Sequence, residues 1–279
     1  MKRFESYGLG PPGLDLNDLT GWLIVIEGTD GVGRSTHIAR LRVHLEQRGY
    51  AVMDTGLSRG DLTRQGIMQA KQGNELGPSA FNLFYATDFA DRLERVIVPA
   101  LRSGFVMLTD RYTYSLLARA IVRGAEPDWI KQVYSFSLKP DAVFYLRIEV
   151  EDLVPRVLQL GGFDYWESGM DLPLGADLYE SFVEYQTRVI RELDTLSADY
   201  GFDVINAAES EERVAAQLAE GVDRVLRSTA RRETAAEPPA ESTVPLELTE
   251  SSRAAAPAAK KARARRKPAA AKPDPLAQP

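Results

Sequence analysis

Short apolar runs recur along the chain, separated by longer stretches that have the periodicity of amphipathic helices. The runs have four to seven residues, and glycine or proline precedes most of them. They cover residues 23–26, 50–53, 105–108, 142–148 and 202–205. Strands that alternate with helices form parallel sheets through right-handed crossovers. The pattern therefore predicts an α/β fold, a five-stranded parallel sheet with helices on both faces.

The first predicted strand leads into a glycine-rich turn, and a helix is expected from about 34 to 47. The spacing Gly28-x4-Gly33-x-Ser35 is that of a phosphate-binding P-loop, in which backbone N–H groups and a helix N-terminus face an anion. The alternative is a glycine-rich turn without a ligand, but the flanking strand and helix favour nucleotide binding. The predicted nucleotide-binding residues are Gly28, Thr29, Asp30, Gly31, Val32, Gly33, Arg34, Ser35 and Thr36.

One position departs from the P-loop pattern, because the motif lysine is replaced by Arg34. Lysine is a compact point charge, whereas the guanidinium group is planar and bulkier, so the exchange is not conservative. Ser35 stands where the motif places a hydroxyl on Mg²⁺.

The strand at 105–108 ends in Thr109-Asp110-Arg111-Tyr112. An acidic residue at the carboxyl end of such a strand faces the ligand crevice. We predict that Asp110 contributes to a Mg²⁺ site and that Arg111 clamps an acceptor phosphate. The alternative is a surface ion pair, and the place at the strand end favours function.

The rest of the chain falls into three parts. Residues 1–20 are expected to form an irregular leader and 21–227 the P-loop domain, including a long helix over 78–102 with Pro99 in its last turn. From residue 228 to 279 the chain is rich in Ala, Pro, Glu and Lys and has no aromatic residue, so we predict a disordered tail.

Composition excludes several classes of protein. No apolar run approaches the roughly 20 residues that cross a bilayer, and the first residues lack the apolar core of a signal peptide, so we expect a cytoplasmic protein. The chain has no cysteine and only two histidines, which argues against disulfides and zinc sites.

The net charge of −6 is unevenly distributed. Residues 228–279 hold ten Lys/Arg and six Asp/Glu, a charge of +4, which leaves −10 on the rest of the chain. The basic patch at 260–267 favours a contact between the tail and nucleic acid or acidic partners. A solvated, dispensable extension is the alternative.

Taken in order and spacing, these segments resemble the thymidylate kinase family over about residues 21–227. The resemblance rests on the P-loop with Asp30 inside it, the helix running into 96–101, and the segment 104–112 followed by Ser115. It implies that ATP and Mg²⁺ are used to phosphorylate the nucleoside monophosphate dTMP, on a five-stranded sheet with a lid over the phosphates. It also raises formation of a homodimer as an open prediction.

The resemblance carries roles over position by position. Asp30 resembles the carboxylate that meets the acceptor sugar, and Tyr85 stands where the family stacks a phenylalanine on thymine. Asp110 and Arg111 resemble the magnesium-side carboxylate and the acceptor-phosphate arginine, and with Arg34 they form the predicted catalytic set. Arg59 is a further predicted substrate residue, although the family segment around it is not present.

Three departures concern the acceptor and the lid. Phe89 replaces the family's arginine that bonds the thymine carbonyl. Ala118-Arg119-Ala120 stands where the family has Ala-Tyr-Gln, and Arg119 is a candidate to replace the lost donor from across the pocket. The expected lid, 157–187, has no Lys or Arg and six carboxylates, which leaves Arg34 and Arg156 to balance phosphate charge. Its aromatic stretch at 161–167 fits a mobile lid or, as the alternative, a surface loop with Tyr165 and Trp166 in the core.

These departures leave two alternatives to a dTMP kinase. One is a kinase for another nucleoside or small acceptor on the same scaffold. The other is a nucleotide-binding module with weakened catalysis. The absence of an Asn-Lys-x-Asp motif argues against a signalling GTPase.

Overall fold

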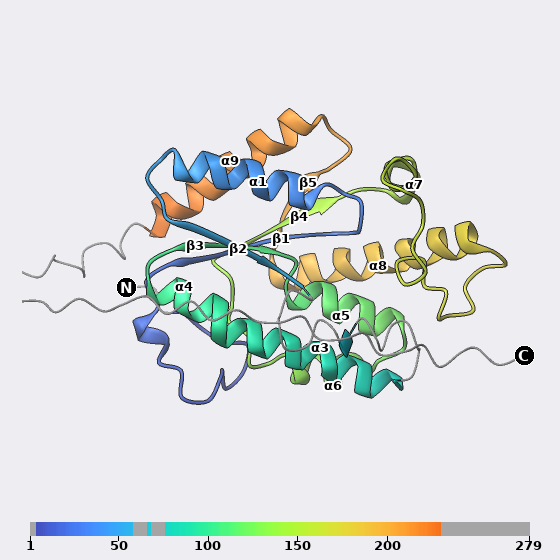
Figure 1. The fold of residues 1–279 in the computed structure, drawn as a ribbon, viewed down its shortest axis with the longest axis horizontal. Coiled ribbons are helices and arrows are strands. Elements are labelled where there is room, and N and C mark those ends of the chain that lie inside the picture. The colour runs from blue at the N-terminus through green and yellow to red at the C-terminus, as the bar shows by residue number, and fades with distance from the viewer. Residues whose placement is uncertain (1–3, 58–65, 68–75, 230–279) are drawn as a thin grey trace, which may run out of the picture. The chain divides into compact units, whose positions relative to one another are not determined.

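The computed structural model describes residues 4–57, 66–67 and 76–229. Five parallel strands form one sheet in the order β2-β3-β1-β4-β5 (Figure 1). Each strand starts within two residues of its predicted position, and the predicted five-stranded parallel sheet is confirmed. The strands are β1 (Trp22–Gly28), β2 (Val52–Gly56), β3 (Val106–Asp110), β4 (Ala142–Arg147) and β5 (Asp203–Asn206).

Helices cover both faces of the sheet, as predicted (Figure 1). Alternate residues of β1 point to opposite faces, so Leu23 and Val25 belong to one core cluster and Ile24 and Ile26 to the other. On one face lie α1 (Arg34–Glu46) and α9 (Glu211–Thr229); on the other lie α3 (Pro78–Arg92), α5 (Thr113–Val122) and α8 (Leu178–Tyr200). The described helices also include α4 (Val98–Arg102), α6 (Pro127–Val133) and α7 (Val150–Gln159).

The long helix predicted over 78–102 is present but is not a regular α-helix throughout. A π-helical turn, Leu93–Ile97, joins α3 to α4. Pro99 is the second residue after it, in the short last segment of the helix. Proline cannot donate to the carbonyl four residues earlier and its ring crowds that carbonyl, and a wider π turn accommodates both effects.

The leader is irregular as far as it is described, but it packs against the domain. Its one helical element within 4–20 is the short 3-10 turn Leu16–Asp18. Phe4 and Leu19 are buried in the core cluster that contains Leu23. Ser6 forms an antiparallel bridge with Leu138.

The register of the sheet sets the position of the site. Ile26 of β1 pairs with Asp110 of β3, and Gly28 pairs with Leu146 of β4. The P-loop therefore leaves the sheet beside the end of β3. Ser228 and Thr229, the first two residues of the predicted tail, are the last residues of α9. The tail from 230 on lies outside the described residues, so its disorder stays a prediction. None of the described helices is long and apolar enough to span a membrane.

Candidate active site

The turn between β1 and α1 has the backbone of an anion-binding loop. Gly31 and Gly33 have φ angles of 80° and 97°, in the left-handed region that favours glycine. Gly33 is also the N-cap of α1 and contributes no side-chain cap, so the first N–H groups of the helix face the loop. The structure therefore places a ready anion site where the sequence predicts the nucleotide phosphates.

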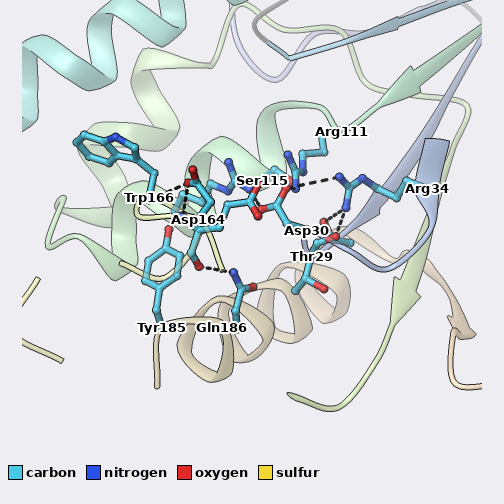
Figure 2. A network of polar contacts seen from close by, with 12 residues as sticks. Thr29, Asp30, Arg34, Arg111, Ser115, Asp164, Trp166, Tyr185 and Gln186 are labelled. Atoms are coloured by element: carbon cyan, nitrogen blue, oxygen red, sulfur yellow. Dashed lines mark hydrogen bonds and ion pairs between the residues drawn. The ribbon is translucent and has the colours of Figure 1, made fainter. Parts of the chain in front are cut away.

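Arg34 turns back along the loop and is only 8% exposed. Its Nε donates to Asp110 Oδ1 at 2.7 Å, and its Nη1 donates to the Gly28 carbonyl oxygen at 2.8 Å. Nη1 also donates to the carbonyl oxygen of Thr29, which lies beside Arg34 in Figure 2. Its Nη2 lies 3.9 Å from Asp30 Oδ1. The guanidinium group therefore cross-links the P-loop to the end of β3. Its N–H donors lie in one plane and point in different directions, which the single nitrogen atom of a lysine cannot reproduce.

The two predicted metal ligands lie beside each other at this cross-link. Ser35 Oγ donates to Asp110 Oδ2 at 3.0 Å. Burial acts to raise the pKa of Asp110, but Arg34 and Arg111 outweigh it and lower the pKa, so the carboxylate is ionised at neutral pH. A hydroxyl and a carboxylate next to a phosphate site fit Mg²⁺, which usually takes one or two carboxylates together with phosphate oxygens and water.

The turn after β3 holds Arg111 in a strained conformation. Among the described residues it is the one non-glycine residue with a positive φ, 67°. Such a conformation costs about 1–3 kcal/mol and is typical of functional sites. Its Nη2 donates to Asp30 Oδ1, while Nη2 of Arg119, on α5, donates to Asp30 Oδ2. Two guanidinium groups therefore share one carboxylate.

Asp30 is the centre of this charge cluster (Figure 2). Its burial acts to raise the pKa of its carboxyl group, but Arg111, Arg119 and Arg34 lower it well below the usual range. The cluster thus brings an ionised carboxylate of the P-loop together with the predicted acceptor-phosphate arginine.

A cavity of about 150 Å³ opens next to this cluster. Of the predicted substrate residues, Asp30, Tyr85, Arg111 and Arg119 line it. Arg59 lies outside the described residues. Three further side chains that the sequence did not single out, Phe81, Asn82 and Arg123, also line the cavity.

Phe89 is in the core and does not face the cavity, which corrects the expectation that it contacts the acceptor base. It has no exposed surface and packs against Tyr112, Tyr134 and Phe136, at ring-centroid distances of 5.0, 6.0 and 5.7 Å. Phe89 follows Tyr85 by four positions, which places it about 6 Å further along α3 at 1.5 Å per residue. Tyr85 therefore reaches the cavity and Phe89 does not.

The segment between α7 and α8, where the lid was expected, is bound to α5 by Arg123. Its Nε donates to Asp171 Oδ2 at 2.8 Å, its Nη2 to the Trp166 carbonyl oxygen at 3.0 Å, and its Nη1 to the Tyr185 hydroxyl. Arg123 is the C-cap of α5 and follows Arg119 by four positions, about one helical turn. That spacing is the signal from which the sequence could have identified it.

The two aromatic residues of this segment are not core residues, in contrast to one of the alternatives above. Trp166 is half-buried, lines the cavity and stacks on Phe81, with ring centroids 5.5 Å apart and planes 23° apart. Tyr165 is 46% exposed. The neighbouring Glu167 also lines the cavity, and its burial and the nearby Asp30 carboxylate raise the pKa of Glu167 to about 7.

A second cavity, of about 270 Å³, is lined by Gly31, Val32 and Gly33 of the P-loop. Arg156 closes one wall, where its Nη2 donates to the Ala207 carbonyl oxygen at 2.7 Å. His37 is 5% exposed and lines the same cavity, and its Nδ1 has no hydrogen-bond partner among the described residues. Burial lowers the pKa of His37, so it is neutral at pH 7. The sequence pointed to Arg156 but gave no signal for His37.

Comparison with known proteins agrees with this geometry. Residues 26–165 match the family model described as thymidylate kinase. A protein of Saccharolobus solfataricus named probable thymidylate kinase 2 is 36% identical over 182 residues, which are 65% of this chain and 85% of that protein. A probable thymidylate kinase of Pyrobaculum aerophilum is 31% identical over 205 residues, 73% of this chain and 97% of that protein. The P-loop, the turn at Asp110-Arg111 and these matches agree, and the chain belongs to the thymidylate kinase family.

Proposed function

We propose that this protein transfers the γ-phosphoryl group of ATP to dTMP, which yields ADP and dTDP. Membership of the thymidylate kinase family supports this reaction. The observation that carries the proposal is the meeting of the P-loop with the Asp110-Arg111 turn at the rim of a cavity that holds Arg111 and Arg119.

ATP is proposed to bind with its phosphates on the P-loop. Fixed N–H groups of the loop and of the first turn of α1 would bind the phosphate oxygens. The cavity beside the loop, with His37 and Arg156 in its wall, would take the nucleoside. Arg156 is a cation close to the loop, since its Nη1 lies 3.5 Å from the Val32 carbonyl oxygen.

Ser35 and Asp110 are the proposed holders of Mg²⁺. The hydroxyl and carboxylate oxygens already lie together at the start of α1, where phosphate oxygens would complete the coordination. When bound, Mg²⁺ neutralises charge on the β- and γ-phosphates as the phosphoryl group moves.

The acceptor phosphate is proposed to replace Asp30 as the partner of Arg111 and Arg119. A dianion offers both guanidinium groups more charge and more oxygens than the carboxylate does, and the fork of Arg111 permits a bidentate contact. Asp30 is then free to accept a hydrogen bond from the acceptor sugar. Tyr85, in the cavity wall, is placed to stack on the base.

The test is a coupled ADP-release assay with dTMP, dUMP, UMP, CMP and thymidine as acceptors. We expect turnover with dTMP and none with thymidine, because the arginine pair requires a phosphate. Discrimination among the pyrimidine monophosphates should be weak, since Phe89 supplies no donor to the base. Asp110→Asn is the control, and it should mainly lower kcat because the metal site matters most in the transition state.

Two results would overturn the proposal. Turnover with thymidine but not with dTMP would assign the fold to a different acceptor. Binding of ATP in calorimetry without turnover of any acceptor would identify a nucleotide-binding module.

A further inference from the structure

Glu27 is a fully buried carboxyl group at the end of β1, directly before the first glycine of the P-loop. Its Oε1 accepts hydrogen bonds from the backbone N–H groups of Tyr112, at 2.8 Å, and Ser115, at 3.3 Å. Its Oε2 is bonded to the Ser115 hydroxyl. All three contacts lie at the beginning of α5.

These contacts cap a helix that has no cap of its own. Tyr112 is the N-cap of α5, and its side chain makes no cap hydrogen bond, because its hydroxyl donates to the Leu138 carbonyl oxygen instead. Thr113, Tyr114 and Ser115 are buried, so water cannot satisfy the first N–H groups of the helix. The side chain of Glu27, from a neighbouring strand, satisfies the N–H groups of Tyr112 and Ser115.

The position of the capped turn determines where the arginines of the cavity lie. Arg111 comes immediately before it, with its N–H bonded to the Ile26 carbonyl oxygen at 3.0 Å. Successive residues of β1, Ile26 and Glu27, thus bind the N–H groups of successive residues of the turn. Arg119 follows on the same helix and Arg123 is its C-cap, so a shift of the first turn is transmitted to both along the helix axis.

We propose that Glu27 is a positioning residue, which fixes the acceptor-phosphate arginines by capping α5 from the central strand. The proposal rests on the proposed function, since it assigns the arginines to dTMP. It predicts that loss of the cap impairs dTMP binding and leaves ATP binding unchanged, because the hydrogen bonds of the Glu27 side chain are made to Tyr112 and Ser115 and not to the P-loop or α1.

The cap does not depend on the ionisation of Glu27. Burial raises the pKa of Glu27. The hydrogen bonds from Ser115 and Tyr112 and the charges of two arginines act to lower this pKa but do not outweigh burial. Both backbone contacts use Oε1 as an acceptor, and a neutral carboxyl or amide group can make them as well. Glu27→Gln is therefore the conservative variant, and Glu27→Met, of similar length, removes the acceptors.

The experiment compares Glu27→Met, Glu27→Gln and Val222→Ala. Val222 is buried in the core of the opposite face, so Val222→Ala controls for lost stability alone. For Glu27→Met we expect the KM and calorimetric Kd for dTMP to rise about tenfold, which corresponds to one lost buried hydrogen bond. The KM for ATP should stay within about twofold, and Glu27→Gln should restore most of the dTMP affinity.

Hydrogen exchange provides a second readout that does not need activity. The amides of 112–116 should exchange faster in Glu27→Met than in Glu27→Gln or Val222→Ala. Should Glu27→Met fail to fold, Glu27→Asp, which draws the oxygens back by one methylene, should show the same split between the dTMP and ATP constants.

The proposal is overturned if Glu27→Met leaves the dTMP constants unchanged, or if Val222→Ala raises them equally. A rise in both the dTMP and ATP constants would also overturn it, as general damage to the site. If the wild-type protein neither binds nor phosphorylates dTMP, the proposed function fails, and the exchange rates at 112–116 alone then decide whether Glu27 is the cap.

Discussion

Replacing Arg34 with lysine tests the most unusual feature of the P-loop. The guanidinium group bonds Asp110 through Nε and two backbone carbonyl oxygens through Nη1. A lysine ammonium group has one nitrogen atom and reaches one of these two ends. We therefore expect Arg34→Lys to break the link between the loop and β3, although the charge is retained.

The size of the effect follows from the hydrogen bonds that the lysine cannot make. A hydrogen bond to a charged group contributes about 1.5–3 kcal/mol to stability, so losing one end of the link should cost about 2 kcal/mol. Arg34 and Asp110 have side chains that are 9% and 13% exposed, so solvent screens this pair little. For a domain of this size, 1 kcal/mol corresponds to about 2–4 °C, which predicts a Tm lower by about 4–8 °C.

Thermal unfolding without nucleotide measures this effect, and Arg40→Lys is the matched control on the same helix. Arg40 pairs with Glu211 at 2.7 Å, but both side chains are nearly half exposed, so the control should shift Tm by no more than about 2 °C. Equal shifts in the two variants would refute the cross-link. Turnover is the second readout. It should persist or rise if Arg34 only replaces the motif lysine, and fall if Arg34 also supplies the charge that the lid segment lacks.

Three further predictions concern the acceptor site and the tail. Arg111→Lys keeps the charge but loses the fork, so it should raise the KM for dTMP far more than the KM for ATP in steady-state assays. The KM for dTMP should rise as the pH passes about 7, because Glu167 is neutral below this pH and above it becomes a carboxylate that repels the acceptor phosphate. Glu167→Gln should remove this pH dependence. A chain that ends at Arg227 should keep the Tm and turnover of the full chain, because the composition of 228–279 does not support a folded core.

Each of these has a clear contrary result. Equal changes in both KM values for Arg111→Lys would place Arg111 outside the acceptor site. A pH profile that survives in Glu167→Gln would assign the titration to another group. A Tm several degrees lower in the shortened chain would show that the tail packs on the domain.

The strands and the centre of the site were predictable because both depend on local pattern and simple topology. Asp30 and Asp110 follow two apolar runs, and the carboxyl ends of adjacent parallel strands meet at one edge of the sheet. The placement of Phe89 was not predictable in this way. It depends on where α3 meets the core. The replacement of the family's arginine by phenylalanine does not by itself distinguish a residue at the cavity from one that lies a turn further along the helix.

Contacts between residues far apart in the sequence could not be predicted from the local hydrophobic pattern either. Arg119 was expected at the base, but in the structure it shares Asp30 with Arg111, which places it beside the proposed phosphate position. Arg123 binds Asp171, 48 residues away, and neither residue has a local sequence context that marks the contact. Such pairs depend on how α5 and its C-cap lie against the P-loop and against the segment before α8, which only the folded chain specifies.

The packed leader has a practical consequence for the design of recombinant forms. The family match begins at residue 26, and shortening the protein to that match would remove residues 22–25 of the central strand β1 as well as Phe4 and Leu19 from the core. It would also remove Tyr7, whose hydroxyl bonds that of Tyr114 on α5. The stripped aromatic surface would face water and favour aggregation, so an affinity tag belongs ahead of an intact leader.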